Sequence, residues 1–221
     1  MYLAVLSQTG IGDAAVRMGG LACNAVVTTT GTINFHLKKW IVWPEVLKLL
    51  AFSTPACIAS SLLTFDATTY FILLGCCLLP AGLITVMGHG KMVKDDDIII
   101  QTKWWIYPIS LVIGFISGIT GIGGGVYLSP ILHLTKWGSA KHIAATSSVY
   151  ILVNSIAGII VQFNKNGQTD LSSVLWLMLA VLAGGLVGSR LSSSLFSQKT
   201  VRILTGVIII FASVKILIRY L

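Results

Sequence analysis

A cluster of glycines in the second half of the chain is the segment best suited to chemistry. It reads Gly118-Ile-Thr-Gly-Ile-Gly-Gly-Gly125 and leads into an apolar stretch that contains Pro130. Each glycine costs a helix about 1 kcal/mol relative to alanine, so the cluster predicts a break in a helix. The helix that starts after the break would direct unpaired N–H groups and its positive end at an anion. The candidate ligands here are Gly121, Gly123, Gly124 and Gly125.

The same glycines have a purely structural interpretation, because small residues also let membrane helices pack closely. We favour the break over packing because four glycines stand together a few residues before Pro130. Lipid cannot satisfy the backbone groups that a break exposes, so the break must face protein or a water-filled cavity. A nucleotide-binding phosphate loop is excluded, because no Lys-Ser or Lys-Thr pair follows the glycines.

Polar side chains near the start of a later apolar block form a second candidate group. Thr146 and Ser147 carry hydroxyls that can donate to an oxyanion without the desolvation cost of a charge, and Asn154 lies further along the block. Such side chains also join membrane helices or bond to their own backbone, and residue type alone does not decide between these roles. The full set of candidate substrate-binding residues is Gly121, Gly123, Gly124, Gly125, Thr146, Ser147 and Asn154.

The titratable residues do not predict a catalytic or metal-binding group. The four histidines are scattered, with no carboxylate or cysteine at ligand spacing. All four cysteines lie inside apolar blocks, and we interpret them as small buried residues rather than as a disulfide framework. No pair of acid, base or nucleophile falls within an apolar block, so we predict no catalytic residue, no metal, no cofactor and no enzymatic activity. The cysteines are Cys23, Cys57, Cys76 and Cys77.

The composition places these candidates in a membrane. Hydrophobic residues make up 55% of the 221 residues and charged residues only 10%, and the mean hydropathy is +0.89. A soluble domain averages about 25% charged residues, so a soluble enzyme is excluded. The net charge of +8 comes from 15 Lys and Arg against 7 Asp and Glu. In a protein with several spans, this excess is typical of loops on the cytoplasmic side, and we do not infer nucleic-acid binding from it.

The apolar residues are collected into blocks that approach the length of about 20 residues needed by a membrane helix. We therefore predict an all-α polytopic membrane protein with about seven transmembrane helices plus half-helices. The predicted transmembrane helices are Gly19–Phe35, Val46–Leu63, Thr69–Gly88, Trp104–Thr120, Ile143–Phe163, Val174–Leu191 and Val201–Ile218. The predicted half-helices are Met1–Leu6 and Val126–Leu134.

The two halves of the chain share the same order of features, which predicts two internal repeats. Each half has a short half-helix, a small-residue helix with a central glycine, a basic loop, a Val/Leu-rich helix and a last helix. Sliding one half along the other places Gly31 on Gly158 and Val26 on Val153. Apolar segments match easily by chance, so the order of features is the stronger argument.

We divide the chain into a first transmembrane repeat at 1–88, a charged central loop at 89–103 and a second transmembrane repeat at 104–221. In this alignment Met1 falls near Leu128, so the first repeat is N-terminally incomplete. Either the chain is a shortened form of a longer protein, or its start codon is internal.

The path of the segment from Trp104 to Leu134 decides how the loops are oriented. If the segment is one broken helix that crosses the membrane, the basic residues divide between the two faces. If it enters and returns to the same side, most basic loops share one face, including those with Lys38 and Lys136. The second arrangement satisfies the positive-inside rule better and makes the repeats inverted, so we prefer it.

Several of these segments together resemble the sulfite exporter TauE/SafE family of membrane transporters. The resemblance is carried by Gly121-Ile-Gly-Gly-Gly125 with Pro130, by Ala145-Thr-Ser147 and by Asn154-Ser-Ile-Ala-Gly158. In the first half, Thr30-Gly-Thr-Ile-Asn-Phe35 is similar to another segment of the family. The first half departs from the family pattern, because it lacks the first glycine cluster and has Met18-Gly-Gly20 where Ala-Thr-Ser is expected.

The resemblance implies a carrier that exports sulfite, sulfonates or related small sulfur-containing anions across the plasma membrane by alternating access. The partners expected are a small anionic substrate and the lipid bilayer, without nucleic acid, and a homo-oligomer is left open. A non-transporting assembly or scaffold subunit is the alternative, because a carrier with half a site would be inactive. The residues themselves do not establish the sulfur chemistry, the coupling ion or the direction.

Overall fold

The computed structural model describes residues 13–63, 66–87, 103–166, 178–179, 181–185 and 198–220. Within these ranges the chain forms helices and turns and contains no strand, so the all-α prediction is confirmed. The helices are α2 (Asp13–Leu37), α3 (Trp43–Ser61), α4 (Ala67–Met87), α5 (Ile106–Thr120), α6 (Gly125–Leu134), α7 (Ala140–Asn166) and α9 (Gln198–Tyr220).

The predicted apolar blocks correspond to these helices. Six of the seven blocks fall on α2, α3, α4, α5, α7 and α9, and the half-helix at Val126–Leu134 is the separate helix α6. The block Val174–Leu191 lies largely outside the described residues, as do the piece Met1–Leu6 and most of the central loop. Helices long and apolar enough to cross a membrane include Thr68–Met87, Ala140–Lys165 and Ile203–Tyr220. The protein is therefore a polytopic helical membrane protein.

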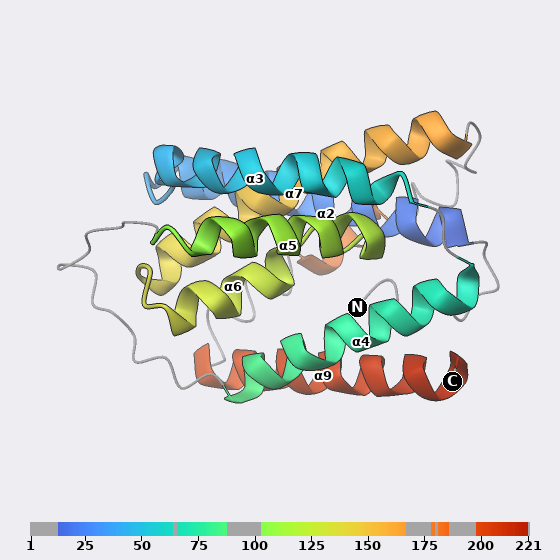
Figure 1. Cartoon of the computed structure of the whole chain (residues 1–221). Helices are drawn as coiled ribbons and strands as arrows, with labels where there is room; N and C mark the ends of the chain where they lie inside the picture. Colours follow the sequence, from blue (N-terminus) through green and yellow to red (C-terminus); the bar gives the residue numbers. More distant parts are fainter. Residues whose placement is uncertain are drawn as a thin grey trace.

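The described helices form two groups (Figure 1). In the larger group, α3 packs on α5, α7 packs on α2 and α3, and α6 packs on α7. The second group is the pair of α4 and α9, which pack along each other and lie below the other helices in Figure 1. Fully buried apolar side chains fill the larger group, including Leu49 of α3, Leu128 of α6 and Ile143 of α7.

The helices α5 and α6 form a hairpin. A Cβ added at Gly124, just before α6, would lie 3.2 Å from atoms of Ile113 and Ser117 in α5, so the chain folds back along α5 after the turn. In Figure 1 the start of α5 and the end of α6 lie at the same end of the bundle. The segment Trp104–Leu134 therefore has the hairpin form that a returning path requires, while its entry into the membrane and its return to the cytoplasmic side stay a prediction.

The contacts between α2 and α7 have the symmetry expected of inverted repeats. Gly31 of α2 approaches Ser148 of α7, and Gly158 of α7 approaches Leu21 of α2. The alignment that places Gly31 on Gly158 also places Leu21 on Ser148, so the two contacts exchange under it. Two antiparallel helices related by a two-fold axis make pairs of contacts of this kind. The domain boundaries at 1–88, 89–103 and 104–221 stay a prediction.

Candidate functional site

The glycine cluster interrupts the helix and separates α5 from α6, as the sequence predicts. Helix α5 ends at Thr120, and Gly121, Gly123 and Gly124 have φ angles of 69°, 81° and 77°. Residues with side chains rarely adopt this left-handed region, whereas glycine does so at no steric cost. Gly124 is the N-cap residue of α6. We call the residues 121–125 the glycine turn.

Gly118 and Gly125 lie on either side of the three glycines with left-handed φ angles, and close packing explains both of them. A Cβ at Gly118 would overlap the hydroxyl of Ser60 and the carbonyl of Cys57 in α3. A Cβ at Gly125 would overlap the side chain of Ile151 in α7. Both interpretations of the cluster therefore apply, each to different glycines: the left-handed positions make the break, and the flanking ones let helices approach.

The glycine turn leaves a run of backbone donors unused. The N–H of Gly121 donates to the carbonyl of Ser117 at 2.8 Å, and the N–H groups of Tyr127 and Leu128 both donate to the carbonyl of Gly124 at 3.1 Å. Between them, the N–H groups of residues 122–126 have no acceptor in the part of the chain that the structure describes. Unpaired N–H groups at the start of a helix form a site for negative charge.

Three carbonyl groups in or just before the turn accept hydrogen bonds from side chains of other helices. The Asn24 amide donates to the carbonyl of Ile122 at 2.8 Å, and the Tyr70 hydroxyl donates to the carbonyl of Thr120 at 2.9 Å. Ser61 donates to the carbonyl of Gly118 at 3.3 Å. With these three carbonyls occupied and the N–H groups of residues 122–126 open, the turn offers donors of the kind that an anion would need. Sequence reasoning did not assign these three side chains, since their partners are distant in the chain.

Helix α7 adds buried hydroxyls beside the glycine turn. The backbone of Ser147 lies next to Gly125, and a Cβ at Gly123 would lie 2.8 Å from the Ser155 hydroxyl. The hydroxyls of Ser147 and Ser155 are buried and make no hydrogen bond with any described residue. Ser155 was not among the predicted site residues. It lies two helical turns after Ser147 on the same face of α7, so helical periodicity could have identified it.

The two other predicted polar residues lie elsewhere on α7. Asn154 accepts a hydrogen bond from Thr54 at 3.2 Å and donates to Ser53 at 3.3 Å, so its side chain is held by α3 rather than directed at the glycine turn. Thr146 is fully buried, and its hydroxyl has no partner among the described side chains and backbone. Direct roles of Thr146 and Asn154 in binding stay predictions.

The cysteines are only partly as expected. Cys23 and Cys57 are buried, as predicted, but Cys76 is exposed and Cys77 is half-buried. The prediction that all four are buried is therefore wrong for this adjacent pair, because consecutive residues of a helix point about 100° apart and α4 is covered on one side by α9. No group of His, Cys, Asp and Glu able to hold a metal occurs among the described residues.

Comparisons with known proteins identify one family and several relatives that are named membrane transporters. The model of the family "Sulfite exporter TauE/SafE" matches residues 3–216. "Probable membrane transporter protein y4hK" of Sinorhizobium fredii is 30% identical over 220 residues, which cover 98% of this chain and 88% of that protein. "Probable membrane transporter protein MamO" of Magnetospirillum gryphiswaldense is 34% identical over 102 residues, 45% of this chain but only 16% of its own length. No solved structure matches significantly.

Proposed function

The chain belongs to the sulfite exporter TauE/SafE family of membrane transporters, and from this premise we propose that it carries small anions through a site at the glycine turn. The substrates we propose are sulfite, sulfonates and related sulfur-containing anions, exported across the plasma membrane. The sulfur chemistry comes from the family description, and the anion preference comes from the geometry of the site.

One observation carries the proposal: at the turn between α5 and α6, the N–H groups of residues 122–126 have no partner among the described residues. They lie next to the buried hydroxyls of Ser147 and Ser155, which are unpartnered in the same part of the chain. Leaving a buried donor unsatisfied costs about 1–3 kcal/mol, so a set of such groups is unfavourable unless a ligand or water satisfies it. A sulfite or sulfonate group offers several oxygen acceptors to such donors. Neutral donors also bind less tightly than a fixed cation, which suits a carrier that must release its substrate.

The arrangement of the helices supports an alternating-access mechanism. The α4–α9 pair meets the larger group mainly along α5 and α6, and the contacts there are few compared with those inside each group. Movement of the pair against the hairpin would open the glycine turn first to one side of the membrane and then to the other. The hydrogen bond from Tyr70 to Thr120 links the moving surfaces directly at the start of the turn.

A non-transporting scaffold subunit is the second candidate function. In this case the buried hydroxyls would have no ligand to bind.

Sulfite flux into proteoliposomes tests the proposal with the substitution Ser155→Ala. Removing one donor to a bound anion should raise the sulfite concentration at half-maximal flux about 5- to 150-fold, because a lost hydrogen bond costs about 1–3 kcal/mol. Ser213→Ala is the matched control, since Ser213 is equally buried but donates to the carbonyl of Gly75 within the α4–α9 pair. If both variants show the same sulfite concentration at half-maximal flux, the proposed site is contradicted. If the unsubstituted protein shows no sulfite flux, the scaffold function is favoured.

A further inference from the structure

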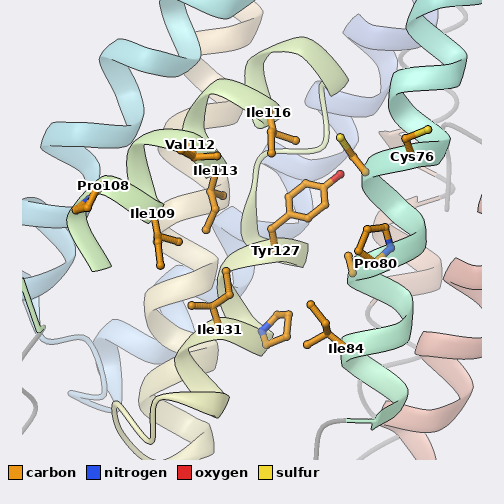
Figure 2. A pocket seen from close by; sticks show the side chains of 13 residues that line it. Cys76, Pro80, Ile84, Pro108, Ile109, Val112, Ile113, Ile116, Tyr127 and Ile131 are labelled. Atoms are coloured by element: carbon orange, nitrogen blue, oxygen red, sulfur yellow. The ribbon is translucent and has the colours of Figure 1, made fainter. Parts of the chain in front are cut away.

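An apolar pocket lies between α4 and the α5–α6 hairpin (Figure 2). Its volume is about 480 Å³, which falls in the range of about 300–1,000 Å³ that is typical of small-molecule sites. An apolar cavity of about 150 Å³ already accommodates benzene, so this pocket holds a considerably larger group. Its walls include Pro80 and Ile84 of α4, Ile109 and Ile116 of α5, and Ile131 of α6.

Tyr127 provides the pocket with a polar group. It lies in the first turn of α6, and only 9% of its surface is exposed. Figure 2 shows its ring between the isoleucines of α5 and the side chains of α4, with the hydroxyl directed toward α4. The hydroxyl approaches Thr120 but makes no hydrogen bond of normal geometry with any described residue. It is therefore available to a ligand, and Thr120 beside it is the residue that directly precedes the glycine turn.

The rest of the lining cannot hold a charge. Apart from Tyr127, the least apolar side chains are the thiols of Cys76 and Cys77, and none of the described residues that line the pocket is charged. An isolated charge inside such walls would lose its hydration without compensation. Binding of a small, fully charged ligand such as sulfite inside this pocket is therefore unfavourable. The pocket instead favours a hydrocarbon group attached to an anion that is held elsewhere.

We propose that this pocket binds the apolar body of an organic anion whose charged group sits at the glycine turn. The inference rests on the proposed function and adds that, beside sulfite, the site prefers sulfonates and related organic anions with a larger aliphatic or aromatic body. Tyr127 would mark the boundary, with its hydroxyl toward the polar head and its ring against the body. A membrane lipid chain is the competing occupant of an apolar pocket at this depth, and the experiments separate the two.

Binding of a homologous series measures the contribution of the pocket. Each compound is titrated separately into the purified protein, and the shift of the melting temperature gives its affinity. The compounds are sulfite, methanesulfonate, butanesulfonate, hexanesulfonate and naphthalene-2-sulfonate. Each buried methylene adds about 0.8 kcal/mol, so affinity should rise up to about fourfold per methylene until the pocket is full. Equal affinities along the series would overturn the proposal. Sulfite flux, measured separately, reports on the glycine turn alone.

The substitution Val112→Phe narrows the pocket at a lining residue that is 55% exposed, so the fold should tolerate it. It should remove most of the preference for hexanesulfonate over methanesulfonate while leaving sulfite flux unchanged. Val207→Phe is the matched control, because Val207 on α9 is similarly exposed but does not line the pocket. An unchanged preference in Val112→Phe would contradict binding in the pocket.

The cysteines of the pocket give a readout that does not need transport. Cys76 and Cys77 should react with N-ethylmaleimide, whereas the buried Cys23 and Cys57 serve as internal controls in mass spectrometry. Hexanesulfonate should slow labelling of the pair, and sulfite should not. If neutral hexanol protects equally well, the pocket is a lipid-chain crevice and the proposal fails. If neither compound protects, it fails as well.

Discussion

Asn24 and Tyr70 determine the chemistry of the glycine turn although neither belongs to it. Each donates a hydrogen bond to a carbonyl of the turn or of the residue just before it. Those two carbonyls are thereby occupied, and the unpaired N–H groups add positive potential at the turn. The glycine φ angles alone would have left both donors and acceptors open. The anion preference that we propose for the turn thus depends in part on side chains that lie far away in the sequence.

Thr146 tests whether an unpartnered hydroxyl serves a ligand. The substitution Thr146→Val keeps the volume and removes the hydroxyl, so it should raise the melting temperature of the ligand-free protein, because a buried unsatisfied donor costs about 1–3 kcal/mol. The same substitution should weaken sulfite binding. Thermal unfolding with and without sulfite measures both effects. A higher melting temperature with unchanged sulfite binding would assign Thr146 to packing alone.

Among the elements, the α5–α6 hairpin is the one for which the sequence allows two paths across the membrane. Its glycines were expected to break a helix, but a break fits either a crossing or a returning segment. The choice depended on the distribution of lysines, and the structure agrees with the returning segment, since Gly124 lies against Ile113 and Ser117 of α5. The broken backbone of such a return must be shielded from lipid, and α3 and α7 pack on the hairpin where this shielding is needed.

Labelling of single cysteines tests the orientation of the hairpin in the membrane. In a cysteine-free background, Lys103→Cys and Lys136→Cys should react with a membrane-impermeant maleimide from the same, cytoplasmic side, because both exposed residues flank the hairpin at one end. Leu62→Cys is the control. Leu62 follows the last residue of α3, and this end of α3 lies at the opposite end of the bundle from the start of α5, so the cysteine should react from the other side of the membrane. Reaction of Lys103→Cys and Lys136→Cys from opposite sides would refute the returning path.

The whole molecule shows what composition and pattern can predict and what they cannot. Apolar blocks define the helices because the bilayer demands length and backbone satisfaction, which are local properties. The break at Gly121–Gly125 could be predicted for the same reason. The placing of Asn154 against Ser53 and Thr54, and of Ser155 beside Gly123, could not, because both depend on how α7 rotates between α3 and the hairpin. The pocket beside Tyr127 arises only when α4 meets that hairpin.

The central claim is that backbone N–H groups of the glycine turn bind the anion, and NMR of the amides tests it most directly. Protein labelled with ¹⁵N-glycine would be titrated with sulfite in detergent micelles or nanodiscs. We expect saturable downfield shifts of the Gly123, Gly124 and Gly125 amide protons, with the same half-saturation as sulfite transport, while Gly82 and Gly206 between α4 and α9 stay unchanged. If sulfite is transported but these three amides do not move, the anion binds elsewhere and the account is wrong.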